Sequence, residues 1–432
     1  MKLKNKQILV YGLGASGRAV IKILQKEHAF LSFYDDSIEY YDYVGFERNP
    51  QDKKYDLVIV SPGIKVLGNT LLQHFKEKNI PIISELDFAY LRAKGKIIAI
   101  TGTNGKTTTC MLTNKILHQA GIKSFLCGNI GLPFSAVCDK TTKDSVVVCE
   151  VSNFQLETSK FFRADVTCIL NIKPDHLDRH GSFEEYKKTK LKLIENLKKK
   201  DLLILNFDDV ESKNASFLHK KVTFFSKNKL KKGVFCHKNQ IYIKKKPIFS
   251  LNNIPLKGDK NLENVLASVA VCSKFNINEY AFETALNNFL PASHRMQEIG
   301  VLNGVTYIDD SKATNVASTV ACVEAFQNFN IILLLGGQSK KIDYDEIFNF
   351  KLKNVVCFGE DGQNILECAK KHKQEAILFE KFDDAVLYCK DFATEGDYVL
   401  LSPACSSFDE FSSYAERGER FKNLVLGCQN EK

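Results

Sequence analysis

One short loop of glycine, threonine and lysine residues carries the strongest chemical signal in the sequence. Segment 101–107 (TGTNGKT) follows the apolar run Ile97–Ile100 and precedes a long helical pattern. Such a strand, loop and helix can bind a polyphosphate, because the loop N–H groups and the positive end of the helix both favour an anion. Lys106 supplies a charge for the β- and γ-phosphates, and the hydroxyl of Thr107 can ligate Mg²⁺. These residues predict nucleoside triphosphate binding, although Ile100 stands where the strict P-loop has a glycine. A structural glycine-rich turn is the alternative.

A second glycine-rich segment, 12–17 (GLGASG), follows the strand-like run Ile8–Tyr11, and Asp35 ends the next such run. This spacing is that of a dinucleotide fingerprint, in which the loop binds a diphosphate and the acid a ribose. Segment 61–63 (SPG) ends a third run and is expected to line the same crevice. The unit is short for a complete dinucleotide domain. The residues therefore fit a nicotinamide cofactor, the diphosphate of another nucleotide-linked ligand, or a structural turn.

Acidic and imidazole side chains follow two further strand-like runs. Glu150 closes one apolar run, and His176 lies in segment 171–180 (NIKPDHLDRH), which follows Val166–Leu170. Because the carboxyl ends of parallel strands meet at one edge, Thr107, Glu150 and His176 are expected on one rim beside the phosphate loop. Carboxylates in such positions hold Mg²⁺ directly or through water. The pattern predicts a metal site, the alternative being an ordinary solvated strand end.

A helical pattern over residues 183–197 contains a lysine on its apolar face. The residues of this face are spaced by three or four positions: Phe183, Tyr186, Lys190, Leu193 and Leu197. Lys190 then either snorkels, with its stem packed inward and its ammonium in water, or faces the site as a functional amine. The pattern alone leaves both possibilities open.

Composition restricts the class of protein. The chain has 432 residues, a net charge of +9 and thirteen cysteines without a C-x-x-C pair. The length predicts roughly two to four domains, and thiols within apolar runs favour a reducing cytoplasm. No apolar run is long enough for a membrane span, so no membrane insertion is expected. The lysine clusters 227–232 and 244–246 separate strand-like runs, which favours solvated hairpin edges over a nucleic-acid groove.

Strands and helices alternate along the chain in three sections, predicted as domains at residues 1–91, 92–291 and 292–432. This alternation predicts the α/β class, with parallel sheets joined by right-handed crossovers. The middle section includes a lysine-rich β excursion. The predicted strands of the last section are Val305–Ile308, Ile331–Leu335, Val355–Phe358 and Tyr398–Leu401. Ligands of such sheets bind at the carboxyl ends of the strands, where the motifs above lie.

Taken together, the motifs resemble those of the Mur ligases, ATP-dependent amide-forming enzymes of peptidoglycan synthesis. The resemblance covers the whole chain and rests on segments 101–107, 128–131 (GNIG), 150–156 (EVSNFQL), 175–180, 294–295 (HR), 310–315 (DSKATN) and 401–407 (LSPACSS), with Asn261 and Asn264. The loop without the first glycine is the family form. Within the family the chain looks most like the members that use D-glutamate, on segments 12–17, 336–340 (GGQSK) and 401–411. Two small departures are Asn153, in place of a serine, and Tyr414, in place of a phenylalanine.

The resemblance implies three α/β domains: an N-terminal Rossmann-like domain, a central P-loop ATPase domain and a C-terminal Rossmann-like domain. It implies ATP contacts by Gly102, Thr103, Asn104, Gly105, Lys106, Thr107, Thr108, Asn261, Asn264, Arg295 and Asp310. Contacts to the UDP-linked substrate are implied for Gly14, Ala15, Ser16, Asp35, Ser61, Pro62, Gly63, Asn129, Ser152 and Gln155. D-glutamate contacts are implied for Lys312, Thr314, Lys340, Ser407 and Phe408. Thr107, Glu150, His176 and a carbamylated Lys190 are implied as Mg²⁺ ligands, and the last three with Lys106 as catalytic residues.

The implied reaction adds D-glutamate to UDP-N-acetylmuramoyl-L-alanine through an acyl phosphate, with ATP and two Mg²⁺ ions, in a cytoplasmic monomer. A family member for another amino acid is the nearest alternative, although the D-N-P-R motif expected of a diaminopimelate-adding member is absent. Folylpolyglutamate synthase shares the central domain but would not need segment 12–17. From other classes, a nicotinamide oxidoreductase and a nucleic-acid-stimulated NTPase remain, the latter with salt-sensitive polynucleotide binding. Neither nucleic acid nor a membrane is expected as a partner.

Overall fold

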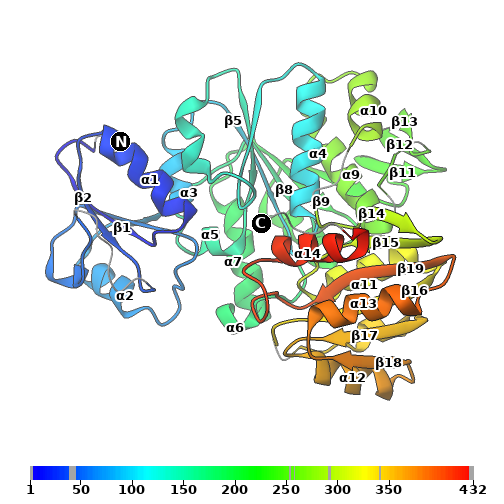
Figure 1. Cartoon of the computed structure of the whole chain (residues 1–432). Helices are drawn as coiled ribbons and strands as arrows, with labels where there is room; N and C mark the ends of the chain where they lie inside the picture. The colour runs from blue at the N-terminus through cyan, green and yellow to red at the C-terminus, as the bar shows by residue number, and fades with distance from the viewer. Residues whose placement is uncertain are drawn as a thin grey trace. The chain divides into compact units, whose positions relative to one another are not determined.

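The computed structural model describes residues 3–37, 45–252, 254–256, 258–289, 293–339 and 342–427, without the side chain of Asp178. Strands and helices alternate along the chain (Figure 1) and form sheets of four, nine and six strands. Most strand pairs are parallel, so the predicted α/β class is confirmed. The chain divides into two compact units, Met1–Pro255 with Glu263–Phe289 and Leu256–Leu262 with Leu290–Lys432. The first two predicted sections therefore share one unit.

The first sheet is parallel and has the order β2-β1-β3-β4. Its strands are β1 (Gln7–Tyr11), β2 (Phe30–Tyr34), β3 (Leu57–Val60) and β4 (Ile82–Ser84), and its helices are α1 (Ala15–Lys26), α2 (Thr70–Glu77) and α3 (Glu85–Tyr90). Every residue of β3 is buried, as expected of an apolar run inside a sheet covered on both faces. Strand order reverses between β1 and β3, which makes the carboxyl ends of these two strands a topological switch point.

The nine-stranded sheet has the order β13-β12-β11-β10-β9-β8-β5-β7-β6. Its strands are β5 (Lys96–Thr101), β6 (Ser124–Gly128), β7 (Val146–Glu150), β8 (Val166–Ile169), β9 (Leu202–Asn206), β10 (Val222–Ser226), β11 (Val234–His237), β12 (Gln240–Ile243) and β13 (Lys246–Ser250). The α-helices of this region are α4 (Lys106–Gln119), α5 (Asn153–Glu157), α6 (Leu177–His180), α7 (Phe183–Glu195), α8 (Val210–Asn214), α9 (Asp259–Cys272) and α10 (Glu279–Asn287). Strand β5 lies between β7 and β8, so the ends of these three strands are neighbours. Helix α9 begins in one compact unit and ends in the other.

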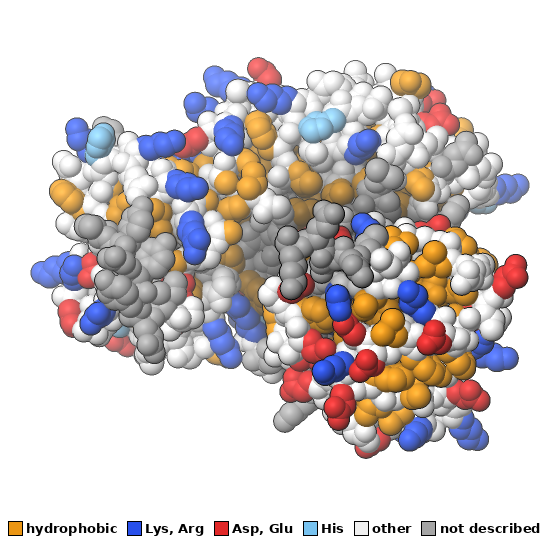
Figure 2. All heavy atoms as spheres, viewed as in Figure 1, with side chains coloured by type: hydrophobic (Ala, Val, Ile, Leu, Met, Phe, Trp, Pro, Cys, Tyr) orange, Lys and Arg blue, Asp and Glu red, His pale blue; other side chains and the backbone are white. Residues whose placement is uncertain are grey.

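The lysine clusters of the β excursion differ in their setting. Residues 244–246 lie at the turn between β12 and β13, which are antiparallel, so the predicted hairpin edge is confirmed there. Residues 227–232 join β10 to β11, which pair in parallel, so the predicted hairpin is wrong for this cluster. The chain must cross over between these strands, and Lys227 pairs with Glu263 at 3.7 Å. Figure 2 shows the Lys and Arg side chains of one face spread among uncharged and acidic groups.

The six-stranded sheet has the order β14-β15-β19-β16-β17-β18, and only the β14–β15 pair is antiparallel. Its strands are β14 (Gln297–Leu302), β15 (Val305–Asp309), β16 (Asn330–Gly336), β17 (Asn354–Phe358), β18 (Ala376–Phe379) and β19 (Asp397–Ala404). Its helices are α11 (Val316–Phe326), the 3₁₀ helix η5 (Asp345–Asn349), α12 (Gly362–Lys371), α13 (Phe382–Phe392) and α14 (Tyr414–Leu426). The sequence missed the edge strands β14 and β18. None of the described helices is both long and apolar enough to cross a membrane.

Candidate active site

The phosphate loop joins β5 to α4 and requires glycine for steric reasons. Gly105 has φ +83°, and a Cβ added there would lie 2.2 Å from Oδ1 of Asn264. That oxygen also accepts a hydrogen bond from Thr109 at 3.3 Å. Asn264 therefore packs against the loop and the first turns of α4, within reach of any group the loop holds. Thr107 and Thr108 are buried in the first turn of α4.

The loop is held by neutral hydrogen bonds from the segment after β8. The amide of Thr103 donates to the carbonyl of Asn171 at 3.0 Å, and the amide of Asn104 donates to Oδ1 of Asn171 at 2.9 Å. The ammonium of Lys106 donates to the carbonyls of Gly102 and Thr103, both at 2.7 Å. Lys106 thus folds back over its own loop, where phosphate oxygens can replace these neutral acceptors.

Glu150 ends β7 beside the phosphate loop, opposite Ile100 of β5. Its side chain is 2% exposed. Oε1 accepts a hydrogen bond from Nδ2 of Asn129 at 2.8 Å, whereas Oε2 is buried and has no hydrogen-bond partner among the described residues. A buried carboxylate oxygen without a partner is costly, and a cation would satisfy it. Asn129, expected along the substrate arm, here orients the carboxylate.

His176 occupies the segment after β8, at the start of α6. Its backbone is left-handed, with φ +51°, and its side chain is exposed. The ring lies 4.9 Å from that of Phe154, which follows Glu150 by four residues on α5. The topology places Glu150 at the end of β7 and His176 after β8, the two strands that flank β5. A metal shared by the two side chains remains a prediction.

Lys190 lies inside the protein. Its side chain is 1% exposed, so the snorkelling alternative is wrong and the inward orientation is confirmed. Nζ donates to Oδ1 of Asn153 at 2.6 Å and lies 4.8 Å from the ring of Tyr186. Burial, and then the charge of Lys106, lower the pKa of Lys190 well below its usual value. The partners of this amine are thus a neutral amide and an aromatic ring.

Two residues expected along the substrate arm cap a helix. Ser152 is the N-cap of α5, and Gln155 completes a capping box in which its Oε1 accepts from the Ser152 amide at 3.0 Å. Asn153 follows in the first turn, and its Nδ2 donates to the carbonyl of Tyr186 at 2.8 Å. The Tyr186 hydroxyl meets Oγ1 of Thr103 at 3.0 Å. A chain of contacts therefore runs from the phosphate loop to Lys190.

The first glycine motif is a tight turn at the switch point of the four-stranded sheet. Gly12 has φ +96°, and a Cβ at Gly17 would lie 1.9 Å from the Gly12 carbonyl. Oγ of Ser61, after β3, donates to the same carbonyl at 2.7 Å. Gly14 caps α1 without a side-chain hydrogen bond, so the N-terminus of this helix offers amide donors near Ala15 and Ser16.

Asp35 closes this turn from the end of β2. Its Oδ2 accepts from the Leu13 amide at 2.6 Å, and Oδ1 accepts from the Ser37 hydroxyl at 2.6 Å. Partial burial opposes ionisation, but the Leu13 and Ser37 donors outweigh it and lower the pKa of Asp35. The carboxylate is therefore fixed beside the loop, and its binding of a ribose remains a prediction.

Arg179 is a residue whose role the sequence reasoning missed. Arg179 forms a bidentate ion pair with Glu157, in which both hydrogen bonds are 2.8 Å long. It also donates to the carbonyls of Pro62 and Ile64 at 3.0 and 2.9 Å, and its guanidinium stacks 4.0 Å from the ring of Phe154. Arg179 thereby ties segment 61–64 of the first sheet to the His176 segment. The signal available was an arginine within the motif DHLDRH.

The predicted D-glutamate residues follow β15 and β19, which are neighbours in the third sheet. Nζ of Lys312 lies 5.1 Å from the ring of Tyr414, so this departure from the family form contacts a predicted site residue. Ser407 is buried, whereas Phe408 is 66% exposed. Thr314 lies two residues beyond Lys312. Lys340 lies outside the described residues.

Three predicted nucleotide residues lie in the second unit. Burial raises the pKa of Asp310 to about 7, although Oγ of Ser402 donates to it at 2.8 Å. Nε of Arg295 is buried without a hydrogen-bond partner among the described residues. Nδ2 of Asn261 contacts the sulfur of Met296 at 3.9 Å. Asn261 falls on the part of α9 that belongs to this unit, whereas Asn264 belongs to the other.

Arg417 organises the same strand ends and was also missed. It is fully buried on α14. Its guanidinium donates to five oxygens, which are the Ser311 hydroxyl and the carbonyls of Ser311, Gly336, Cys405 and Ser406, at 2.9–3.4 Å. These acceptors lie at or just after the ends of β15, β16 and β19, so one cation holds all three strand ends. Burial lowers its pKa to about 10, which leaves Arg417 charged at neutral pH.

Family models match two parts of the chain. Residues 100–272 match the Mur ligase middle domain, and residues 294–405 match the Mur ligase, glutamate ligase domain. The UDP-N-acetylmuramoylalanine--D-glutamate ligase of Alkaliphilus metalliredigens is 37% identical over 451 residues, covering 98% of this chain and 99% of its own length. The ligase of the same name from Acidobacterium capsulatum is 38% identical over 454 residues, covering 99% of this chain and 97% of its own length.

Solved structures agree at the level of the fold. UDP-N-acetylmuramate-alanine ligase MurC of Thermotoga maritima gives a TM-score of 0.64 at 19% identity, over 98% of this chain and all of that chain. MurF ligase of Thermotoga maritima, solved with ADP, gives a TM-score of 0.61 at 16% identity, over 99% of this chain and 97% of that chain. The resemblance predicted from the motifs is therefore confirmed, and the chain belongs to the Mur ligase family.

Proposed function

We propose that this protein adds D-glutamate to UDP-N-acetylmuramoyl-L-alanine with consumption of ATP, as a step of peptidoglycan synthesis. The observation that carries the proposal is the full-length similarity, at 34–38% identity, to ligases named for this reaction. The phosphate loop, the strand-end carboxylate Glu150 and the buried Lys190 supply the chemistry that such a ligase needs.

The reaction must first give the alanine carboxylate a good leaving group. A carboxylate oxygen attacks the γ-phosphorus of ATP, ADP leaves, and an acyl phosphate forms. The amine of D-glutamate then attacks the acyl carbon, phosphate leaves, and the amine loses a proton to solvent. Both steps bring anions together, so Lys106 and the helix N-terminus at Gly105 act by electrostatic stabilisation.

The residues around the phosphate loop fit magnesium. Glu150 offers a buried oxygen that has no hydrogen-bond partner in the described part of the chain, and Thr107 offers a hydroxyl at the start of α4. Mg²⁺ prefers such oxygen ligands and, when bound, would neutralise charge on the transferred phosphate. His176 and a carbamylated Lys190 would be ligands at a second Mg²⁺ position. For Lys190 the support is its burial beside neutral partners, where an uncharged amine can accept CO₂.

The switch point of the first sheet would hold the uridine diphosphate. The backbone amides of Gly14, Ala15 and Ser16, at the N-terminus of α1, would bind the diphosphate. Asp35 and segment 61–63 lie on either side of this loop. Asn129, Ser152 and Gln155 would contact the muramoyl-alanine part of the substrate.

In the second unit Lys312, Thr314, Lys340, Ser407 and Phe408 would bind D-glutamate, while Asn261, Arg295 and Asp310 would complete the ATP site. The three domains would be residues 1–91, 92–291 and 292–432, in a cytoplasmic monomer.

One assay tests this function. Phosphate release from ATP is measured with UDP-N-acetylmuramoyl-L-alanine and each of a panel of amino acids, with product identified by mass. We expect release that depends on both substrates and is strongest with D-glutamate. If release occurs only with an amino acid other than D-glutamate, the protein is a different ligase of the family. Release without any amino acid, stimulated by polynucleotide, would overturn the proposal.

A further inference from the structure

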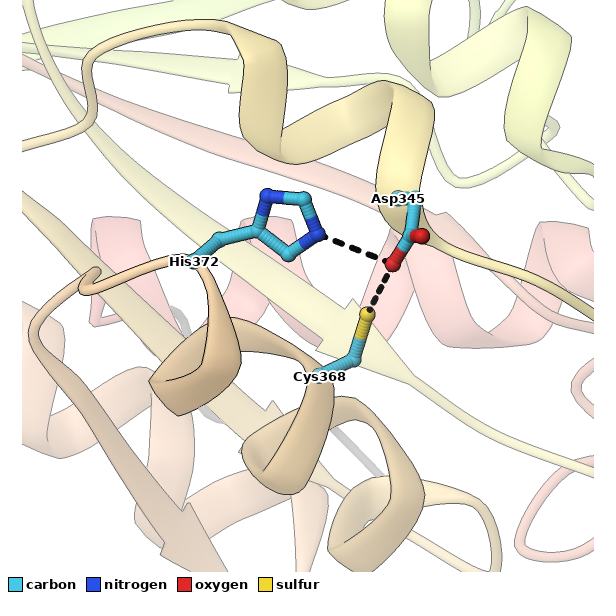
Figure 3. A group of neighbouring side chains, drawn as sticks. All are labelled: Asp345, Cys368 and His372. Atoms are coloured by element: carbon cyan, nitrogen blue, oxygen red, sulfur yellow. Dashed lines mark hydrogen bonds and ion pairs between the residues drawn. The ribbon is translucent and has the colours of Figure 1, made fainter.

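A cluster of three metal-binding side chains lies in the second unit, apart from the residues assigned above. Figure 3 shows Asp345 of η5 facing Cys368 and His372 at the C-terminal end of α12. Oδ1 of Asp345 lies 3.2 Å from Sγ of Cys368 and 2.9 Å from Nε2 of His372. Helix α12 starts at the carboxyl end of β17 and runs back along the sheet. The C-terminal end of α12 therefore lies toward the amino ends of the strands, whereas the predicted D-glutamate residues follow their carboxyl ends.

The donor set and its spacing suit a tetrahedral ion. Cys368 lies in the last turn of α12, and His372, four residues later, is the C-cap of this helix, so both face Asp345. Zinc bonds of about 2.0 Å to N or O and about 2.3 Å to S imply ligand separations of roughly 3.3 Å between N and O and 3.5 Å between S and O. The three donor atoms lie within 4.8 Å of one another. Opening the two hydrogen bonds by a few tenths of an ångström would bring both distances from Asp345 to these separations.

The surroundings give the ion a route and additional charge. A hollow of about 420 Å³ reaches the cluster and is lined by Asp343, Glu367, Asn364 and Lys371, among others. Asp345 is ionised at neutral pH, because His372, Cys368 and Lys371 lower its pKa to about 2. Burial raises the pKa of Cys368 to about 11, so the free thiol keeps its proton until a metal replaces it. Lys371, at 3.3 Å from Asp345, is the one cation that competes within this described cluster.

We propose that Asp345, Cys368 and His372 bind one divalent transition ion of the zinc class, with water as fourth ligand. Binding forms one bond each from sulfur, nitrogen and oxygen to the metal, and the thiol proton passes to solvent. The ion braces η5 against α12 and takes no part in ligation chemistry. The alternative is that these side chains form only hydrogen bonds and ion pairs.

Cobalt titration of the full chain tests the site after treatment with a chelator. One equivalent of Co²⁺ should produce a thiolate-to-cobalt absorption band, which Zn²⁺ abolishes; binding at Glu150 or His176 cannot produce this band. Cys368→Ser should lose it, while Cys236→Ser, at another part-buried cysteine, should retain it. Lys371→Gln should tighten binding. Zn²⁺ at about 100 times its Kd should raise the Tm by roughly 5 °C in the parent only.

Absence of a stoichiometric thiolate band would overturn the metal site. A band that survives Cys368→Ser would overturn it as well. If Cys368→Ser lowers Tm equally with and without Zn²⁺, the cluster is a hydrogen-bonded brace. Ligase activity of Cys368→Ser should match the parent, since no assigned substrate contact is altered.

A second, independent observation concerns Asn153. This residue is 4% exposed, and its amide is fixed at both ends. Nδ2 donates to the carbonyl of Tyr186 at 2.8 Å, so Oδ1 must face Lys190, whose Nζ donates to it at 2.6 Å. A carbamate made when Nζ bonds the carbon of CO₂ and releases one proton still has one N–H. That N–H can keep its bond to Oδ1.

We infer that Asn153 is a positioning residue: it holds the Lys190 nitrogen so that a carbamate group points away from Asn153. This inference rests on the proposed carbamylation. Partners of metal ligands typically contribute 10–100-fold to affinity or activity. Asn153→Ala should therefore lower carbamate occupancy by about tenfold, with rescue by added bicarbonate, and Asn153→Ser, which retains an acceptor, should lose less.

The readout is the ¹³C carbamate resonance of protein equilibrated with labelled bicarbonate. Lys190→Ala removes the signal, whereas Lys188→Ala, on the exposed side of the same helix, leaves it unchanged. A parent protein without the signal overturns the carbamylation itself. A parent and Asn153→Ala with equal signals overturn only the role of Asn153.

Discussion

The strand ends of the nine-stranded and six-stranded sheets both bear the residues expected to do chemistry, but they are held together in different ways. Around β5 the loop is fixed by neutral hydrogen bonds to Asn171 and by the Lys106 ammonium on two of its carbonyls, while Oε2 of Glu150 has no partner among the described residues and Lys190 has neutral partners. Around β15, β16 and β19 the loops are fixed by the buried cation Arg417. The first arrangement leaves charge to be balanced by ligands, whereas the second carries its own internal charge.

Removal of that internal charge should have the largest effect. Arg417→Leu leaves five oxygens without their donor, and we expect a loss of about 3–5 kcal/mol in the free energy of unfolding. Urea unfolding of the full chain measures it. Arg420→Leu, on the same helix but part-exposed in its pair with Asp383, should cost about 1 kcal/mol or less. Equal losses in both variants would show that Arg417 is no more structural than a surface pair.

At the nine-stranded sheet the corresponding change should affect catalysis rather than folding. Glu150→Gln keeps an acceptor for Asn129 but removes the negative charge. We expect acyl-phosphate formation to fall by about 10²–10³ and the Mg²⁺ requirement to rise. Uridine-nucleotide affinity should be unchanged, as should all properties of Glu195→Gln at the exposed end of α7. A variant that loses only uridine-nucleotide affinity would place Glu150 away from the phosphate site.

Alanine variants of two glycines can separate a steric clash at the phosphate loop from backbone strain alone. Gly105 and Gly121 both have positive φ, but only at Gly105 would a Cβ collide with a neighbour. Both alanine variants should carry backbone strain of about 1 kcal/mol or more. Gly105→Ala should in addition lose ATP affinity, measured by calorimetry, because Asn264 must move. Equal ATP affinity in the two variants would contradict a close fit at Asn264.

A smaller, pH-dependent effect is expected in the second unit. The hydrogen bond to Asp309 at 2.6 Å raises the pKa of His294, against partial burial; Glu419 also favours the charged form and Lys422 opposes it. A raised folded-state pKa stabilises the protein below about pH 6.5. This contribution is lost as pH rises through the folded value. His294→Gln should flatten the fall in urea midpoint between pH 6 and pH 9; an unchanged slope would contradict the assignment.

The smallest effect should come from Tyr414. Because Lys312 lies over the ring, Tyr414→Phe should change the KM for D-glutamate by less than about twofold, while Tyr414→Leu should raise it by roughly two- to fivefold. A large effect of Tyr414→Phe would instead assign a role to the hydroxyl.

The strands with continuous apolar runs were predictable from sequence to within a few residues, because burial on both faces requires such runs. Strand β14 was not, since its residues are part-exposed at a sheet edge next to an antiparallel partner. The parallel pairing of β10 with β11 also has no local signal. The places of the motifs after strands were predictable, whereas the roles of their residues stay predictions. Arg417 and the Asn153–Lys190 pair were not, because their meaning depends on neighbours far along the chain.

Helix α9 has a mechanical consequence. Its first residues, Asp259–Leu262, belong to one compact unit and the remainder to the other, and it is one continuous helix across that boundary. Main-chain hydrogen bonds run along the length of a helix, so residues 259–272 act as one stiff rod whichever unit they are counted in. Asn264, two residues beyond Leu262 and against Gly105, stands where a displaced phosphate loop would push on that rod.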